Sequence, residues 1–218
     1  MKKVYDTINQ YCVEHELLTN GDGIVIGLSG GMDSVCLLQV LAALRNEWQL
    51  RLVCVHVHHG IRGTAADEDA AFAQRLAAKY NISFRLYEMD IPQLAKEQGL
   101  SEEEAGRNYR YRCFEEVRKE LNFDKIAVAH HRDDQAETVL WQILRGSGLR
   151  GVCGMRAGRA NIIRPLLCLD RQQIEQIVRG NGDGWREDAT NREEKYTRNK
   201  IRNRVFPYIE QEIQPMAR

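Results

Sequence analysis

The chain has 218 residues, 43% of them hydrophobic and 28% charged, and its 31 basic and 31 acidic side chains give a formal net charge of zero. This length allows one substantial α/β domain. No apolar run approaches the roughly 18 residues of a membrane span, and the first residues lack an apolar signal core. We therefore expect a cytoplasmic protein without membrane contact. The six cysteines are scattered without a C-x-x-C pair, which argues against a zinc ribbon, an iron–sulfur cluster and a disulfide scaffold.

Segments typical of strands alternate with segments typical of helices along the chain. Strands are predicted at 23–29, 50–58, 82–89 and 126–130, with a short one at 162–164, and helices at 33–46, 64–80, 101–121, 133–145, 170–179 and 196–212. This alternation predicts an α/β fold, a parallel sheet with helices on both faces. We expect one domain over the whole chain, with a core at about 20–180 and a helical extension at about 181–218.

The turn between the first predicted strand and its helix reads Ser29-Gly30-Gly31-Met32-Asp33-Ser34. A helix that begins at the carboxyl end of a parallel strand offers unpaired N–H groups to an anion. Gly30 and Gly31 permit close backbone approach, and Asp33 is expected to hold Mg²⁺ against phosphates or to orient the loop. The stretch is neither a Walker A loop nor a dinucleotide fingerprint. The alternative is an ordinary turn whose serine caps the helix; we interpret it as a nucleotide phosphate site.

Histidines and acids gather where two other predicted strands end. Because parallel strands share a direction, these ends should open onto the same sheet edge as the phosphate loop. Asp133, Asp134 and Glu137 are spaced to share one helical face and suit Mg²⁺ or a cationic substrate. The alternatives are acids that merely favour the helix N-terminus and, less favoured, a zinc site built from the histidines. The five histidines concerned are His56, His58, His59, His130 and His131.

Basic side chains are concentrated in the second part of the chain. Residues 1–124 carry 14 basic and 19 acidic groups, whereas residues 125–218 carry 17 and 12. Between 145 and 164 there are five arginines and no acid, overlapping a glycine-rich stretch at 146–158 that we expect to be a functional loop. Such a patch suits a polyanion such as nucleic acid, with a solvated surface as the alternative.

Several segments, in this order, resemble the tRNA(Ile)-lysidine synthetase family. They are SGGMDS (29–34), HVHHGIRG (56–63), EAGRNYRYRCFEE (104–116), HHRDDQAET (130–138), RGSGLRGVCGM (145–155), IIRPLL (162–167), WREDATN (185–191) and YTRNKIRN (196–203). The resemblance implies the Rossmann-like adenine nucleotide alpha hydrolase fold of PP-loop ATP pyrophosphatases. It also implies a carbon–nitrogen ligase that joins lysine to the wobble cytidine of an isoleucine tRNA with a CAU anticodon. ATP would adenylylate the cytidine, and pyrophosphate and AMP would leave.

The resemblance also implies roles for single residues. Asp134 and Glu137 would receive the lysine ammonium, and Asp33 is the candidate Mg²⁺ ligand. Arg110 would bind the substrates or the charge between them, and with these three acids it completes the candidate catalytic set. Arg107 and Arg112 are close competitors for that role, and a surface ion pair is the alternative for Arg110. The residues implied to bind ATP are Ser29, Gly30, Gly31, Met32, Asp33, Ser34 and His56.

The implied macromolecular partner is tRNA(Ile) with a CAU anticodon, alongside L-lysine, and a homodimer stays open. Many family members continue into a further helical region, whereas this chain stops at Arg218, so it is either a short form or a catalytic-domain fragment. For a fragment, we expect ATP binding to survive and tRNA affinity to fall. Two alternatives remain: another PP-loop tRNA-modifying enzyme such as a thiolase, for which Cys113 and Cys153 lack a suitable setting, and a non-catalytic ATP-binding module. Phosphate contacts are expected from Arg145, Arg150, Arg156, Arg198, Lys200 and Arg202, although the last three also fit a solvated helix face.

Overall fold

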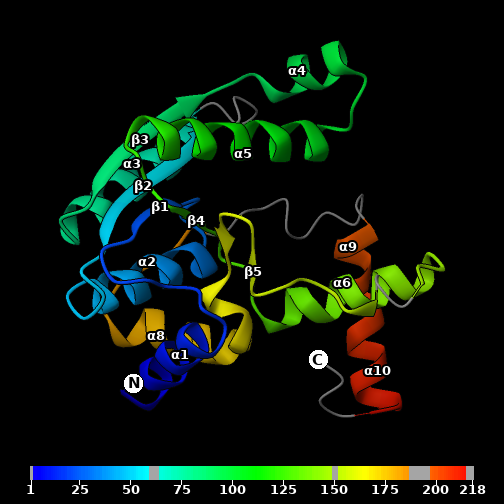
Figure 1. Ribbon diagram of the computed structural model, residues 1–218. Coiled ribbons are helices and arrows are strands. Elements are labelled where there is room, and N and C mark those ends of the chain that lie inside the picture. Colours follow the sequence, from blue (N-terminus) through cyan, green and yellow to red (C-terminus); the bar gives the residue numbers. More distant parts are fainter. Residues whose placement is uncertain (1, 59–63, 149–151, 187–196, 215–218) are drawn as a thin grey trace.

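A computed structural model describes residues 2–58, 64–148, 152–186 and 197–214. Its centre is a six-stranded sheet with the strand order β3-β2-β1-β4-β6-β5 (Figure 1). Every neighbouring pair is parallel except the pair of β5 and β6. The strands are β1 (Gly23–Gly27), β2 (Arg51–His58), β3 (Ser83–Glu88), β4 (Lys125–Ala127), β5 (Gly158–Arg159) and β6 (Ile162–Ile163). The predicted parallel sheet is therefore confirmed, with one antiparallel edge strand added at the end of the glycine-rich stretch.

Helices cover both faces of the sheet, as the alternating pattern predicted. Three helical segments were not predicted, α1 (Lys2–Glu14), α4 (Ile91–Gln98) and the short 3-10 helix η1 (Pro165–Cys168). The others are α2 (Met32–Leu44), α3 (Thr64–Lys79), α5 (Glu102–Glu120), α6 (Arg132–Leu144), α8 (Arg171–Gly180), α9 (Thr197–Lys200), the π-helical η3 (Ile201–Val205) and α10 (Phe206–Glu212). In the part of the chain that the structure describes, no helix is both long enough and apolar enough to cross a membrane.

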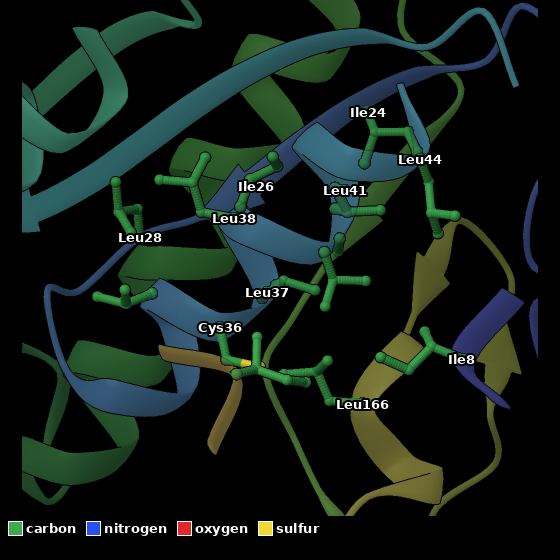
Figure 2. Packing of buried hydrophobic residues seen from close by; sticks show 14 of the residues in the cluster. Ile8, Ile24, Ile26, Leu28, Cys36, Leu37, Leu38, Leu41, Leu44 and Leu166 are labelled. Carbon is green, nitrogen blue, oxygen red and sulfur yellow. The ribbon is translucent and has the colours of Figure 1, made fainter. Parts of the chain in front are cut away.

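Two hydrophobic cores lie on opposite faces of β1. Val25 points to the face covered by α4 and α5, whereas Ile24 and Ile26 point to the face covered by α1, α2 and α8. Figure 2 shows the second core, in which leucines of α2 reach toward the strand on one side and toward Ile8 and Leu166 on the other. A helix buried on nearly all sides must be apolar on nearly all sides, which explains the run from Val35 to Leu41. The core thereby holds the start of α2 in place at the sheet edge.

The end of β1 is packed closely against α5, and a substitution at Gly27 tests this packing. A Cβ atom added to Gly27 would lie 2.7 Å from Cζ of Phe114 on α5. We therefore expect Gly27→Ala to cost about 1–3 kcal/mol of folding free energy through overpacking. At this chain length that corresponds to a melting temperature lower by about 2–10 °C. Gly184→Ala is the matched control, because a Cβ there meets nothing within 4 Å. Equal melting temperatures of the two variants in thermal denaturation would contradict the packing described.

Candidate active site

The predicted phosphate loop lies at the carboxyl end of β1, where the chain turns into α2. Ser34 holds it: its Oγ accepts from the Gly30 N–H at 3.1 Å and donates to the Gly31 carbonyl at 2.8 Å. Ser29 Oγ lies 3.1 Å from the same hydroxyl. Gly30 has a φ of 90°, a conformation that favours glycine. In the described structure no side chain caps α2 at Gly31, so its first N–H groups and its dipole face the loop and suit an anion.

Asp33 in this loop is only loosely paired within the described residues. Its Oδ1 is buried and accepts no hydrogen bond from them, and Nη1 of Arg171 lies 3.8 Å from it. Burial raises the pKa of the Asp33 carboxyl, and the charges of His131 and Arg171 oppose that rise. A divalent cation carried by nucleotide phosphates would satisfy this oxygen, and Mg²⁺ commonly uses one or two carboxylates together with phosphate oxygens. The side chain therefore fits a Mg²⁺ ligand, as predicted.

The start of α6 stands beside this loop because β4, the strand that precedes it, pairs in parallel with β1. His131 is the N-cap of α6: its Nδ1 accepts from the Asp133 N–H at 3.3 Å, and Oδ2 of Asp134 accepts from the His131 N–H at 3.1 Å. The predicted capping role of the acids is thus confirmed for Asp134. With Nδ1 as the acceptor, a neutral ring carries its proton on Nε2.

His131 connects the phosphate loop to the acids of α6. Its Nε2 lies 3.7 Å from Oδ2 of Asp33 and 3.6 Å from Oδ2 of Asp134, and it makes no hydrogen bond with the described residues. A single imidazole between two carboxylates shows that the first strand and the fourth open onto one edge, which confirms that part of the sequence prediction. The histidine was noted at its strand end but given no role of its own.

Asp134 and Glu137 form a buried acidic pair that holds the guanidinium of Arg202. Arg202 donates from Nε to Oε1 of Glu137 at 2.5 Å, and from Nη2 to Oε2 of Glu137 and Oδ1 of Asp134, each at 3.0 Å. Glu137 is 1% exposed and Asp134 8%. The two acids lie together as their helical spacing predicted. They receive an arginine that had been assigned to tRNA phosphates, which the local sequence could not indicate.

His56 supports the loop from β2. Its ring is buried, lies near Phe84, and has Nδ1 2.8 Å from the carbonyl oxygen of Leu28, directly before the loop. Burial lowers the pKa of His56; the contact with Leu28 raises it, and the charge of Arg110 lowers it further. A neutral ring at this position donates from Nδ1 to the carbonyl. His56 thus stabilises the backbone that leads into the phosphate loop.

The three arginines of α5 differ in what they contact. Arg112 stacks on the ring of Tyr109 at 4.8 Å and Arg107 on that of Tyr111 at 5.5 Å. Arg110 is exposed as a residue, yet partial desolvation of its guanidinium lowers its pKa, and its charge lowers the pKa of His56.

The predicted tRNA contacts occupy different settings. Arg145 is exposed at the end of α6 and stacks on Trp141 at 5.5 Å, and Arg156 and Lys200 are exposed. Arg150 lies outside the described residues. Arg198 belongs to α9, and its side chain is likewise outside the described part. The exposed cations Arg145, Arg156 and Lys200 are available to a polyanion.

Arg186 was not predicted, yet it contacts the phosphate loop. Its N–H donates to the Gly30 carbonyl at 2.9 Å. Its guanidinium pairs with Asp69 and Glu68 of α3, each at 2.7 Å. A segment more than 150 residues along the chain therefore fastens the loop to α3. The WRED sequence was part of the resemblance, but no local pattern indicated where it would lie.

Comparison with known proteins agrees with this geometry. The family model described as PP-loop domain matches residues 2–209. The chain is similar to the curated tRNA(Ile)-lysidine synthase of Caldanaerobacter subterraneus, 48% identical over 97% of this chain and 44% of the relative. It is also similar to that of Geobacillus kaustophilus, 36% identical over 95% and 46%. The chain thus spans a little under half the length of these curated relatives.

Solved structures show the same fold. A U34-tRNA thiolase from Methanococcus maripaludis, described with its [4Fe-4S] cluster, superposes with a TM-score of 0.76 at 18% identity, covering 99% of this chain and 75% of the thiolase. An NH3-dependent NAD synthetase from Campylobacter jejuni superposes with a TM-score of 0.55 at 17% identity, covering 83% and 73%. At such identities the likeness concerns the fold alone.

Proposed function

This chain belongs to the PP-loop domain family, and from that premise we propose that it is an ATP-dependent ligase that joins L-lysine to the wobble cytidine of a tRNA(Ile) with a CAU anticodon. Curated relatives that share 36–48% of its residues over nearly the whole chain carry the name tRNA(Ile)-lysidine synthase. The observation that carries the proposal is the contact of His131 with both Asp33 and Asp134, since it joins a phosphate site to a cation site. A tRNA substrate agrees with a cytoplasmic location.

In the first step, ATP binds with its phosphates at the N-terminus of α2, where Gly30 lets the backbone approach them. Asp33 would hold Mg²⁺, which neutralises charge that develops on the departing pyrophosphate. The cytidine O2 forms a bond to the α-phosphorus while the bond from that phosphorus to pyrophosphate breaks. Arg110 would stabilise the charge between the two substrates.

In the second step, the lysine ε-amine attacks C2 of the adenylylated cytidine. A C2–N bond forms, the C2–O2 bond breaks, and AMP leaves with the oxygen. Asp134 and Glu137 would receive a lysine ammonium by charge-assisted hydrogen bonds. The attacking amine must be neutral, so a carboxylate beside it would take its proton. We assign this role to Asp134, the acid of the pair that also lies 3.6 Å from Nε2 of His131.

The tRNA would be held by cations around this edge. Arg145, Arg156 and Lys200 are exposed and would contact phosphates, and we propose the same for Arg150 and Arg198. The target base is a wobble base of an anticodon loop, where bases can turn outward and be read on their edges. Because the relatives are about twice as long, we expect part of the tRNA affinity to come from regions outside this chain.

The thiolase alternative expects reactive cysteines near the nucleotide. Cys12 and Cys54 are buried in hydrophobic cores, where burial raises the pKa of each thiol to about 12. Among the described residues there is no group of three or more side chains placed to hold a metal. Cys36 and Cys113 are buried as well, whereas Cys153 is exposed. The burial of these four thiols, which disfavours the thiolate form, supports the lysine ligase over a thiolase that would use them.

The test is incubation of the protein with radiolabelled lysine, ATP, Mg²⁺ and bulk bacterial tRNA. We expect ATP-dependent labelling of RNA that resists acid, and no labelling of a tRNA(Ile) transcript whose wobble cytidine is replaced by uridine. High tRNA concentration compensates for weak binding by this chain. ATP binding without ATP–pyrophosphate exchange would instead indicate a non-catalytic module. Exchange that depends on tRNA, without lysine transfer, would indicate another tRNA-modifying enzyme.

A further inference from the structure

Arg202 fills the site that the proposed function assigns to the substrate ammonium. Its guanidinium makes three hydrogen bonds to the acidic pair, two with Glu137 and one with Asp134. Glu137 is only 1% exposed, so its carboxylate is withdrawn from solvent and both of its oxygens accept hydrogen bonds from this guanidinium. A lysine ammonium would require the same oxygens, so the two cations exclude each other by both charge and space.

The arginine is placed at the solvent side of the pair. Its side chain is 30% exposed, against 1% for that of Glu137 and 12% for that of Asp134. It comes from η3, a π-helix, and such helices occur disproportionately at functional sites. Buried anchors flank it on the same segment, Ile201 and Phe206, at 2% and 4% exposure. The guanidinium can therefore leave the pair by a rotamer change toward solvent while its helix stays anchored.

We propose that Arg202 is an internal competitor that occupies the ammonium site of the free protein, and that lysine binds by displacing it. This inference rests on the proposed function, since it takes Asp134 and Glu137 as the lysine site. A guanidinium matches two carboxylates better than an ammonium does. Only an amine that binds the site tightly enough would therefore displace Arg202, and weakly binding amines would be excluded. It also keeps a buried acidic pair neutralised until substrate arrives.

The decisive measurement is lysine affinity by equilibrium dialysis with the wild type and Arg202→Ala. If Arg202 occupies the acidic pair in 90% or more of the free protein, removal of its side chain should tighten lysine binding by about tenfold or more. The variant should melt at a lower temperature without ligand, and lysine or ethylguanidinium should restore its melting temperature. Neither cation should stabilise the wild type to the same extent. Arg75→Ala removes an exposed arginine of α3 and is the matched control, expected to bind lysine like the wild type.

Further variants keep each outcome informative. If Arg202→Ala does not fold, Arg202→Lys retains a tethered cation without the fork, and we expect lysine to bind it severalfold more tightly than the wild type. Glu137→Gln combined with Arg202→Met should lose the gain in affinity. Lysine affinity that is unchanged or weaker in folded Arg202 variants would overturn the proposal that Arg202 competes with lysine. If ethylguanidinium stabilises Arg202→Ala while lysine binds neither protein, the proposed lysine site is wrong instead.

Discussion

Asp134→Asn is expected to lower lysine transfer to tRNA by about 30- to 150-fold while ATP affinity changes by less than about threefold. Loss of one charged hydrogen-bonding partner in a buried site is worth roughly 2–3 kcal/mol, which corresponds to this range. The fold at this position should survive, because an asparagine oxygen can still accept from the His131 N–H and start α6. The effect therefore reports the missing charge and not a missing helix turn.

The measurement separates the two half-reactions. Release of pyrophosphate in the presence of tRNA without lysine reports activation of the base, and transfer of labelled lysine reports the second step. Asp133→Asn is the matched control, since it removes the charge of a neighbouring acid of the same helical turn, whereas Arg202 pairs with Asp134 and Glu137. Equal loss of ATP binding and of lysine use in Asp134→Asn would show that the assignment of this residue is wrong.

Asp33→Asn is expected to change activity and stability in opposite directions. ATP-dependent activation should fall by about a hundredfold or more, because the ligand for Mg²⁺ at the phosphates is lost. The free energy of unfolding should rise by roughly 1 kcal/mol, since a buried oxygen without a hydrogen bond costs about that amount or more and an amide is less costly to bury than a carboxylate. In a chain of this length, that is about 2–4 °C in melting temperature.

Thermal denaturation without nucleotide, together with pyrophosphate release over a series of Mg²⁺ concentrations, checks both effects. Asp69→Asn provides the contrast, because Asp69 is already paired with Arg186 at 2.7 Å and its replacement should lower the melting temperature. A lower melting temperature for Asp33→Asn would mean that this carboxylate stabilises the fold, and the interpretation as a site kept for a metal would fail.

The elements that the sequence predicted well are those with strong local signals. The first strand and α2 were found because an apolar run meets glycines and then a second apolar run, and the structure places β1 at Gly23–Gly27 and α2 at Met32–Leu44. The helix predicted at 101–121 also begins where expected, since Oγ of Ser101 caps it and accepts from the Glu104 N–H at 3.2 Å. These signals depend on neighbours within a few residues, which a sequence shows directly.

Two helices were missed although they carry local signals. Helix α1 is amphipathic, with Ile8 and Cys12 buried four residues apart. Helix α4 is short, and it begins at the N-cap Asp90 and ends at Gly99 in the left-handed conformation. Strand β5 consists of two residues and is stabilised by pairing with β6, which no local pattern encodes.

By itself, the sequence determined the phosphate loop, the helical spacing of Asp134 and Glu137, and the order of strands and helices that puts both at one sheet edge. Only the tertiary structure decided what meets them: His131 between two carboxylates, Arg186 on the loop, and Arg202 within the acidic pair. The reason is physical. A basic residue on a helix has the same local pattern whether it faces solvent or an acid 65 residues away, and long-range packing alone selects between them.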